Sequence, residues 1–408
     1  MHLLRPQIKG RRPGWLRFAG MIAASVLLTP AWTAAGHADS LVPALPQIGA
    51  GGVALSTKLA ETVELNSNPL LQYGPHKSTI GSITSPELTV RDDAPDWHMD
   101  LDERVDVNRY DLPNYSSVDS HALYHGLYAF QRTVAGLDAA YDYDTTRTSE
   151  ITGSGNNIAG IRHRGLSLTP NVATSLTDVD QVKLQTGVLD SSYANTRSYT
   201  PYRVYSGSAI YQRTIDSTNA ALGTVQGSRY ETRSGPQVTI DTWSPQVGWA
   251  TSLTSELSLN GMGGLQFSRT TSPIVVGSST DQDYALALSL LHKMEQNVLD
   301  LRLTRAPTPQ SNGTQVQSTS LSVNDTYLLE PRLTLNMFGY YQVSEYNSGN
   351  QQNSDLLLLS PKISYQLYKD VEINLNYRYS RQDNSSGQVS SSNAILFGFV
   401  IKPDEFGL

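Results

Sequence analysis

Apolar and polar side chains alternate without a break from 371 to 380, and this alternation constrains the fold more than any other feature. One face carries only aliphatic and tyrosine side chains, whereas the other carries Glu372, Arg378 and three small polar residues. Residues 363–367 alternate in the same way, and only the short turn 368–370 separates the two runs. A period of two is the mark of a β-strand with two different environments. The pattern therefore predicts a β-hairpin with one apolar and one polar face.

The rest of the chain repeats this hairpin. Short connections recur every 36 to 44 residues, centred near Ala94, Val134, Asp178, Asp216, Thr254, Glu295, Pro331 and Lys369. Longer connections rich in Ser, Gly, Asn and Thr lie between them, at 66–79, 111–118, 149–157, 271–280, 307–314, 347–352 and 383–389.

These connections divide the chain into about 18 strands, with 16 to 18 as the expected range. The strands are predicted to begin near Gly52, Gly81, Asp96, Asp119, Thr133, Ile158, Val179, Tyr202, Asn219, Gln237, Thr254, Asp281, Asn297, Gln315, Arg332, Asn353, Asp370 and Ser390. An even number of hairpin-connected strands returns both ends to one side. The predicted fold is all-β: a closed antiparallel transmembrane barrel over residues 53–408, with short periplasmic turns and longer extracellular loops.

A second repeat has the form Ser/Thr-Pro-x-aliphatic. It occurs at Pro86, Pro170, Pro245 and Pro361, each in a strand that leads to a short turn. Because proline gives up a ladder hydrogen bond, each should mark a bulge or a strand end. The alternation also changes phase near Trp243, where we therefore expect a bulge.

The first 38 residues have the features of a cleaved export signal. Five Lys and Arg side chains precede a short apolar core at 18–28, and Gly36-His37-Ala38 supplies small residues at the cleavage positions. The core is too short for a membrane-spanning helix, which needs about 20 residues. Residues 39–52 would form a short periplasmic lead. Loss of five positive charges from a net charge of −7 leaves −12, which gives no support to nucleic-acid binding.

A membrane barrel explains the repeat better than a soluble sandwich, a secreted β-solenoid or an adhesin. Those folds would not alternate long and short connections over so many long strands. Barrel closure pairs every backbone group, as hydrocarbon demands. The expected location is the outer membrane, with lipid and the barrel-assembly machinery as partners. The terminal aromatic residue that this machinery usually meets would be Phe399 or Phe406.

Charged residues on the polar face are candidates for the lining of a hydrated lumen. They are Asp100, Asp102, Arg104, Asp106, Asp138, Asp142, Asp144, Lys183, Arg302, Glu372 and Arg378. The alternative, given equal weight, is that they pair across strands and fill the barrel.

No motif indicates a cofactor, a metal or a catalytic site. His121 and His125 are about 13 Å apart if both lie on one strand, too far for one ion. The glycines at 261–264 precede no helix, and no G-x-S-x-G or H-E-x-x-H occurs.

Residues 57–150 resemble the outer-membrane barrels associated with exopolysaccharide loci, including the PEP-CTERM-associated outer-membrane family. The similarity lies in the opening strand 57–71 with its Asn-rich end, the Ser-Pro strand 82–90, and the acidic, tyrosine-bearing hairpin 99–150. It implies a role in moving or anchoring a secreted polysaccharide, with that polymer and periplasmic export components as partners, and it brings no catalytic residues.

Three functions remain open from the sequence. The leading hypothesis is a non-enzymatic channel or accessory component for exopolysaccharide export. The second is a general or substrate-selective diffusion porin. The third is a barrel hydrolase whose Ser and His would be brought together from different strands.

Overall fold

The computed structural model describes residues 52–112, 114–150, 160–194, 197–272, 278–346 and 353–407. The predicted export signal and all of the predicted periplasmic lead except Gly52 lie outside the described residues, so both stay predictions.

The described residues form eighteen wall strands and two short elements. The wall strands are β1 (Gly52–Asn66), β2 (Thr79–Ala94), β3 (Trp97–Tyr110), β4 (Ser117–Phe130), β5 (Thr133–Thr145), β6 (Arg162–Ser175), β7 (Asp180–Tyr193), β8 (Tyr202–Thr214), β9 (Asn219–Thr232), β10 (Thr239–Ser252), β11 (Leu257–Thr271), β12 (Ser278–Lys293), β13 (Asn297–Pro309), β14 (Gln315–Glu330), β15 (Leu333–Glu345), β16 (Ser354–Tyr368), β17 (Val371–Asn384) and β18 (Val389–Ile401). The short elements are the one-turn helix α1 (Thr146–Ser149) and β19 (Phe406–Gly407).

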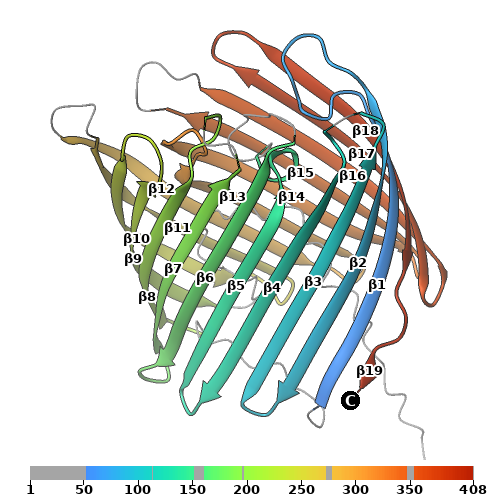
Figure 1. The fold of residues 1–408 in the computed structure, drawn as a ribbon. Helices are drawn as coiled ribbons and strands as arrows, with labels where there is room; N and C mark the ends of the chain where they lie inside the picture. Colours follow the sequence, from blue (N-terminus) through green and yellow to red (C-terminus); the bar gives the residue numbers. More distant parts are fainter. Residues whose placement is uncertain are drawn as a thin grey trace, which may run out of the picture.

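Every wall strand pairs antiparallel with its neighbours in sequence, and β18 pairs with β1 through Leu59 to Asn66. The predicted closed barrel of 18 strands is confirmed, and the predicted strand starts differ from the observed ones by four residues at most. Figure 1 shows the tilted strands, the short turns at the lower end and the longer loops at the upper end. Bacterial barrels place their short turns in the periplasm. We call the opposite end, which carries the longer loops, the long-loop end.

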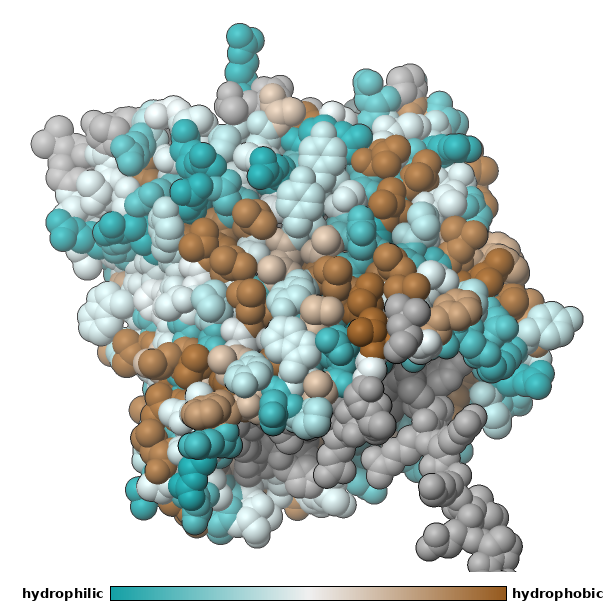
Figure 2. Space-filling view, turned by 60° about the horizontal axis from the view of Figure 1, so that its bottom comes forward, coloured by the Kyte–Doolittle hydropathy of each residue, from teal (hydrophilic) through white to brown (hydrophobic). Residues whose placement is uncertain are grey.

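The two faces of the wall differ as the alternation predicts. In β17, Leu375 and Tyr377 are exposed on the outer face, whereas Ser380 is buried on the inner face. Figure 2 shows apolar side chains gathered in patches over the outer surface. An apolar outer face and a polar inner face suit lipid outside and water inside.

The Ser/Thr-Pro repeats interrupt the sheet without bulging it. At Pro86, Pro170, Pro245 and Pro361 the pairing with the following strand lapses for two residues and resumes in the same register. The expected bulge at Trp243 is therefore wrong. The apolar phase changes there because Ile240 points inward, against buried Tyr230, whereas Trp243 and Val247 point outward.

At one such interruption the backbones approach closely enough to exclude a side chain. A Cβ on Gly264 would lie 2.0 Å from the carbonyl oxygen of Pro245 and 2.7 Å from the Cα of Gln246. A Cβ on Gly223, in β9, would meet nothing within 4 Å.

Gly264→Ala is therefore expected to lower the stability of the folded barrel by about 1–3 kcal/mol, the usual cost of overpacking. The temperature at which the heat-modifiable band shifts in SDS gels measures the effect. Gly223→Ala is the matched control and should leave that temperature unchanged. Equal behaviour of the two variants would contradict the close approach.

The C-terminal segment continues the last wall strand. Phe406 and Gly407 pair with Leu55 and Ala54 of β1, one residue out of register with the β18 pairing. The irregular stretch between them contains Pro403, which has no N–H to donate. Phe406 is exposed and pairs with an outward-facing position, so an aromatic side chain lies at the short-turn rim.

Candidate functional site

The inner face of β1–β6 is acidic, and we call it the acidic wall. It carries ten carboxylates and three Lys or Arg, a net charge of 3 − 10 = −7 with His neutral: Glu64, Glu87, Asp93, Asp100, Asp102, Asp106, Asp119, Asp138, Asp142 and Asp144, with Lys58, Arg91 and Arg104. These positions alternate with outward-facing residues and face one another across neighbouring strands, which places them on the lumen side.

Cross-strand contacts organise this wall. His121 Nδ1 lies 2.7 Å from Asp142 Oδ1, and His125 Nδ1 lies 2.6 Å from Asp138 Oδ1. Arg91 donates from Nε to Asp100 at 2.8 Å. The acids are thus held in fixed positions by neighbours, yet they outnumber the cations. The wall keeps a negative field that a mobile ion would meet.

All eleven predicted lumen residues lie on the inner face, but they do not form one cluster. Seven of them lie on β3 and β5, the two strands that pair with β4: Asp100, Asp102, Arg104, Asp106, Asp138, Asp142 and Asp144. The other four lie apart. Lys183 is on β7, Arg302 pairs with Asp300, Glu372 lies 3.9 Å from Lys362, and Arg378 donates to Glu64 at 2.5 Å. Their part in passage stays a proposal.

The prediction missed several members of the acidic wall. Glu87, Arg91 and Asp93 alternate along β2 as clearly as the residues of β3 do, so the same period would have found them. His98 contacts both Asp93 and Asp100. Single histidines carry no such pattern, and only the pairing of β2 with β3 reveals this contact.

The inner face of the next five strands is almost free of charge, and we call it the hydroxyl wall. Along β7–β11 Lys183 is the only Lys, Arg, Asp or Glu among the described inward positions, and Ser, Thr and Gln dominate there. Hydroxyl and amide groups can exchange hydrogen bonds with any polar solute.

The helix α1 turns from the wall into the lumen at the long-loop end. Arg147 extends over the ring of Tyr110 on β3, 4.3 Å from its centroid. Glu150, which follows α1, accepts hydrogen bonds of 2.6 Å from Tyr193 Oη on β7 and from Ser311 Oγ. Both Glu150 and Ser311 are buried. One turn of helix thus joins three separate parts of the barrel.

The tip of the β13–β14 hairpin lies against α1 inside the barrel and is held there by contacts of its own. Tyr230 on β9 donates a hydrogen bond of 3.2 Å to the carbonyl oxygen of Gln310. The backbone N–H of Thr200 donates a hydrogen bond of 2.6 Å to the carbonyl oxygen of Ser311. Tyr230 is 0 % exposed and Ser311 is 1 % exposed. We call α1 and this tip together the constriction. The predicted polar loops, 307–314 and 149–157, contain the tip but only the last residue of α1, and nothing in the sequence indicates that either segment turns inward.

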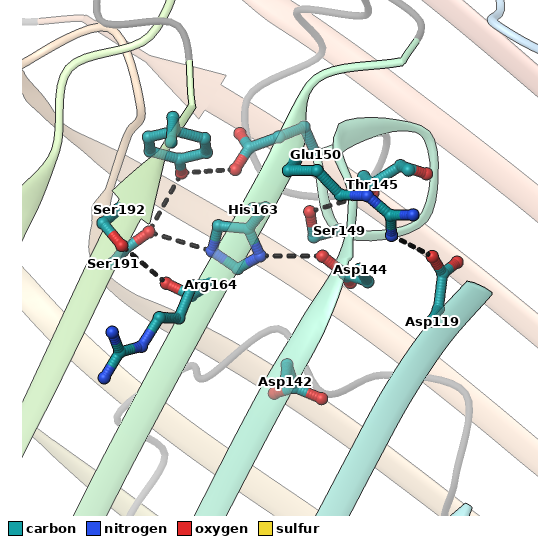
Figure 3. A network of polar contacts seen from close by, with 12 residues as sticks. Asp119, Asp142, Asp144, Thr145, Ser149, Glu150, His163, Arg164, Ser191 and Ser192 are labelled. Atoms are coloured by element: carbon teal, nitrogen blue, oxygen red, sulfur yellow. Dashed lines mark hydrogen bonds and ion pairs between the residues drawn. The ribbon is translucent and has the colours of Figure 1, made fainter. Parts of the chain in front are cut away.

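A buried relay of hydrogen bonds lies beneath the constriction (Figure 3). His163 joins Asp144 Oδ1 at 2.9 Å and Ser191 Oγ at 3.0 Å, while Ser191 donates to Tyr193 Oη at 3.1 Å. Gly165 pairs with Ser191 and lies two residues from His163 on the same face of β6, and a Cβ there would lie 3.2 Å from the imidazole. The missing side chain therefore lets the ring lean across to the next strand.

These three residues have the contacts of a Ser–His–Asp triad but not its polarity. Ser191 donates its proton to Tyr193, which in turn donates to Glu150, so His163 is left to donate to Ser191. A general base must instead accept the serine proton. Ser191 is also 2 % exposed, with no space for an acyl group. We therefore assign the relay to support of the constriction.

Among the described residues, no helix is long and apolar enough to cross a membrane. Within the same part of the chain, no group of three or more His, Cys, Asp or Glu is arranged to hold a metal ion.

A closed barrel that is apolar outside, polar inside and narrowed at its long-loop end defines the class: the chain is an outer-membrane β-barrel protein. No protein-family description matches the sequence, and no curated protein matches it.

Solved structures with a similar course of the chain include a porin and a copper transporter. The chain is similar to a BenF-like porin from Pseudomonas fluorescens Pf-5, with 10 % identity, 87 % of this chain and 99 % of that chain covered, and a TM-score of 0.46. It is similar to OprD from Pseudomonas aeruginosa, with 8 % identity, 91 % and 100 % coverage, and a TM-score of 0.44. It is similar to the copper transporter OprC, with 12 % identity, 84 % and 62 % coverage, and a TM-score of 0.46, so it spans less than two thirds of that protein. Likenesses this distant carry no functional inference.

Proposed function

We propose that this protein is a selective diffusion channel that passes small polar solutes across the outer membrane and favours cations. The observation that supports this most strongly is the constriction beside the acidic wall, held by buried hydrogen bonds from Glu150 to Tyr193 and Ser311. A narrow passage lined by fixed charges selects small hydrated solutes by size and by sign of charge.

Export of a polysaccharide has less support. A sliding polymer needs a continuous wide path, whereas α1 and the β13–β14 tip meet across the lumen in the described part of the barrel. The diffusion channel therefore replaces export as the leading hypothesis, and no catalytic step is needed for it.

Reconstitution of the mature protein tests the proposal. In planar bilayers we expect discrete ion currents with a reversal potential of the sign that marks cation preference. In liposome swelling, neutral and cationic solutes of monosaccharide size should enter faster than anionic ones of equal size. Absence of ion currents would contradict the channel. Currents blocked by polysaccharide but not by monosaccharide would restore the export hypothesis.

A further inference from the structure

The pairing of β12 with β13 stops halfway along both strands. It runs only from Leu286–Arg305 to Lys293–Val298. Yet β12 pairs with β11 from Ser278 to His292, and β13 pairs with β14 up to Pro309. Towards the long-loop end, the two strands therefore separate, and 282–285 of β12 do not pair with 306–309 of β13.

Beyond the separation, the β13–β14 hairpin lies on the lumen side of its neighbours. Gln266, which points inward from β11, donates to Gln317 of β14 at 2.9 Å. Thr242, which points inward from β10, lies 3.4 Å from Oε1 of Gln315. Gln315 and Gln317 share the face of β14 that carries outward-facing Leu321 lower down. The outer face of the hairpin is thus packed on the inner face of β10 and β11.

The two strands have the composition of a seam at which a ladder can end. The β13 edge contains Pro307 and Pro309, which offer no N–H to a neighbouring strand. The β12 edge, 278–285, is mostly exposed and polar. If the pairing continued in its present register, Gln282 would lie opposite Pro309 and Asp283 opposite Thr308.

Arg305 lies where the strands part and links both sides of the seam. Its guanidinium contacts Asp283 of β12 at 2.9 Å and Glu345 of β15 at 2.8 Å, and it stacks on Tyr284 at 4.5 Å. These contacts stabilise the base of the hairpin at a point where the ladder ends. Motion would therefore be confined to the part above Arg305.

We propose that the upper β13–β14 hairpin is the gate of the channel. In its tucked position the tip closes the constriction through Ser311 and Gln310. In its other position its residues 306–309 pair with 282–285 of β12, so that the hairpin rejoins the wall and widens the lumen. The two prolines weaken that second pairing, so the tucked state prevails. This inference rests on the proposed channel function, and it names how the same constriction is regulated.

Engineered disulfides test the gate, because the protein has no cysteine of its own. Gln282→Cys with Pro309→Cys would join residues that face each other only in the rejoined wall. Thr200→Cys with Gly313→Cys would fix the tucked tip, because a Cβ on Gly313 lies 3.5 Å from the Cβ of Thr200, within disulfide range. Each single-cysteine variant serves as a control, including for the positive φ of Gly313.

The full-length mature protein would be oxidised in liposomes and measured in planar bilayers before and after reduction. We expect the first pair to give a several-fold higher conductance when oxidised, and the second pair to suppress openings until it is reduced. If currents are present but neither oxidised pair changes them, the gate is overturned while the channel stands. If the first pair cross-links in the membrane and no variant conducts, the movement of the hairpin is supported and the proposed channel function is contradicted. Failure of the first pair to cross-link in a conducting protein also overturns the gate.

Discussion

Neutralising three acids of the acidic wall is expected to remove most of the preference for cations. The variant combines Asp106→Asn, Asp138→Asn and Asp142→Asn, which keep the shape and one acceptor oxygen of each side chain. A unit charge acts on an ion at about 10 Å with roughly 0.4 kcal/mol at the permittivity of water, so three charges sum to about 1.2 kcal/mol. Because the same charges stabilise a cation and destabilise an anion by this amount, the cation-to-anion permeability ratio should change by about 2.4 kcal/mol, roughly a fiftyfold fall.

The reversal potential in a salt gradient measures this ratio, and low ionic strength keeps screening small. The matched control removes three acids from the outer face: Glu103→Gln, Glu231→Gln and Asp241→Asn. It changes the net charge equally and should leave selectivity intact. Equal shifts in both variants would mean that net charge, and not the acidic wall, determines selectivity.

Glu150→Ala is expected to loosen the constriction and raise the conductance. The carboxylate accepts hydrogen bonds from Tyr193 and Ser311, and all three side chains are buried. Its removal leaves two buried hydroxyl groups without their acceptor, at a cost of about 1–3 kcal/mol each. The helix α1 and the β13–β14 tip should then separate for part of the time, and single-channel records should show larger and noisier currents.

Glu150→Gln is the informative comparison, because an amide keeps one acceptor oxygen at the same place. The conductance of the glutamine variant should lie between the conductances of the wild type and the alanine variant. A conductance that is unchanged in both variants would show that these hydrogen bonds do not limit passage, whatever they contribute to stability.

The barrel was predictable because its signal is local. Strand direction and face follow from a period of two within each segment, so the eighteen strands could be placed to within four residues of their observed starts. The prediction of a bulge at Trp243 was wrong for a related reason. A change of apolar phase has two causes, a bulge or a reversal of the buried face, and a single strand does not distinguish them. Ile240 points inward because Tyr230 and Val204 lie beside it on other strands.

The candidate site was predictable only in part. Alternation identified the charged inner face of β3 to β5 but left open whether its residues pair or meet solute. Their partners, such as His121 for Asp142, depend on the register between strands. The residues of the constriction carry no periodic signal at all. Arg147, Glu150 and Ser311 lie in connections, where side-chain type does not reveal direction.

By itself the sequence determined that this chain forms a barrel of 16 to 18 strands and indicated which positions alternate between the two faces of each strand, because these depend on spacing within single hairpins. The tertiary structure alone decided that the lumen narrows, and where. That outcome depends on Ser311 meeting Glu150 across 161 residues of chain and on β13 parting from β12. Contacts of this kind form only after closure brings distant strands together, so no local pattern encodes them.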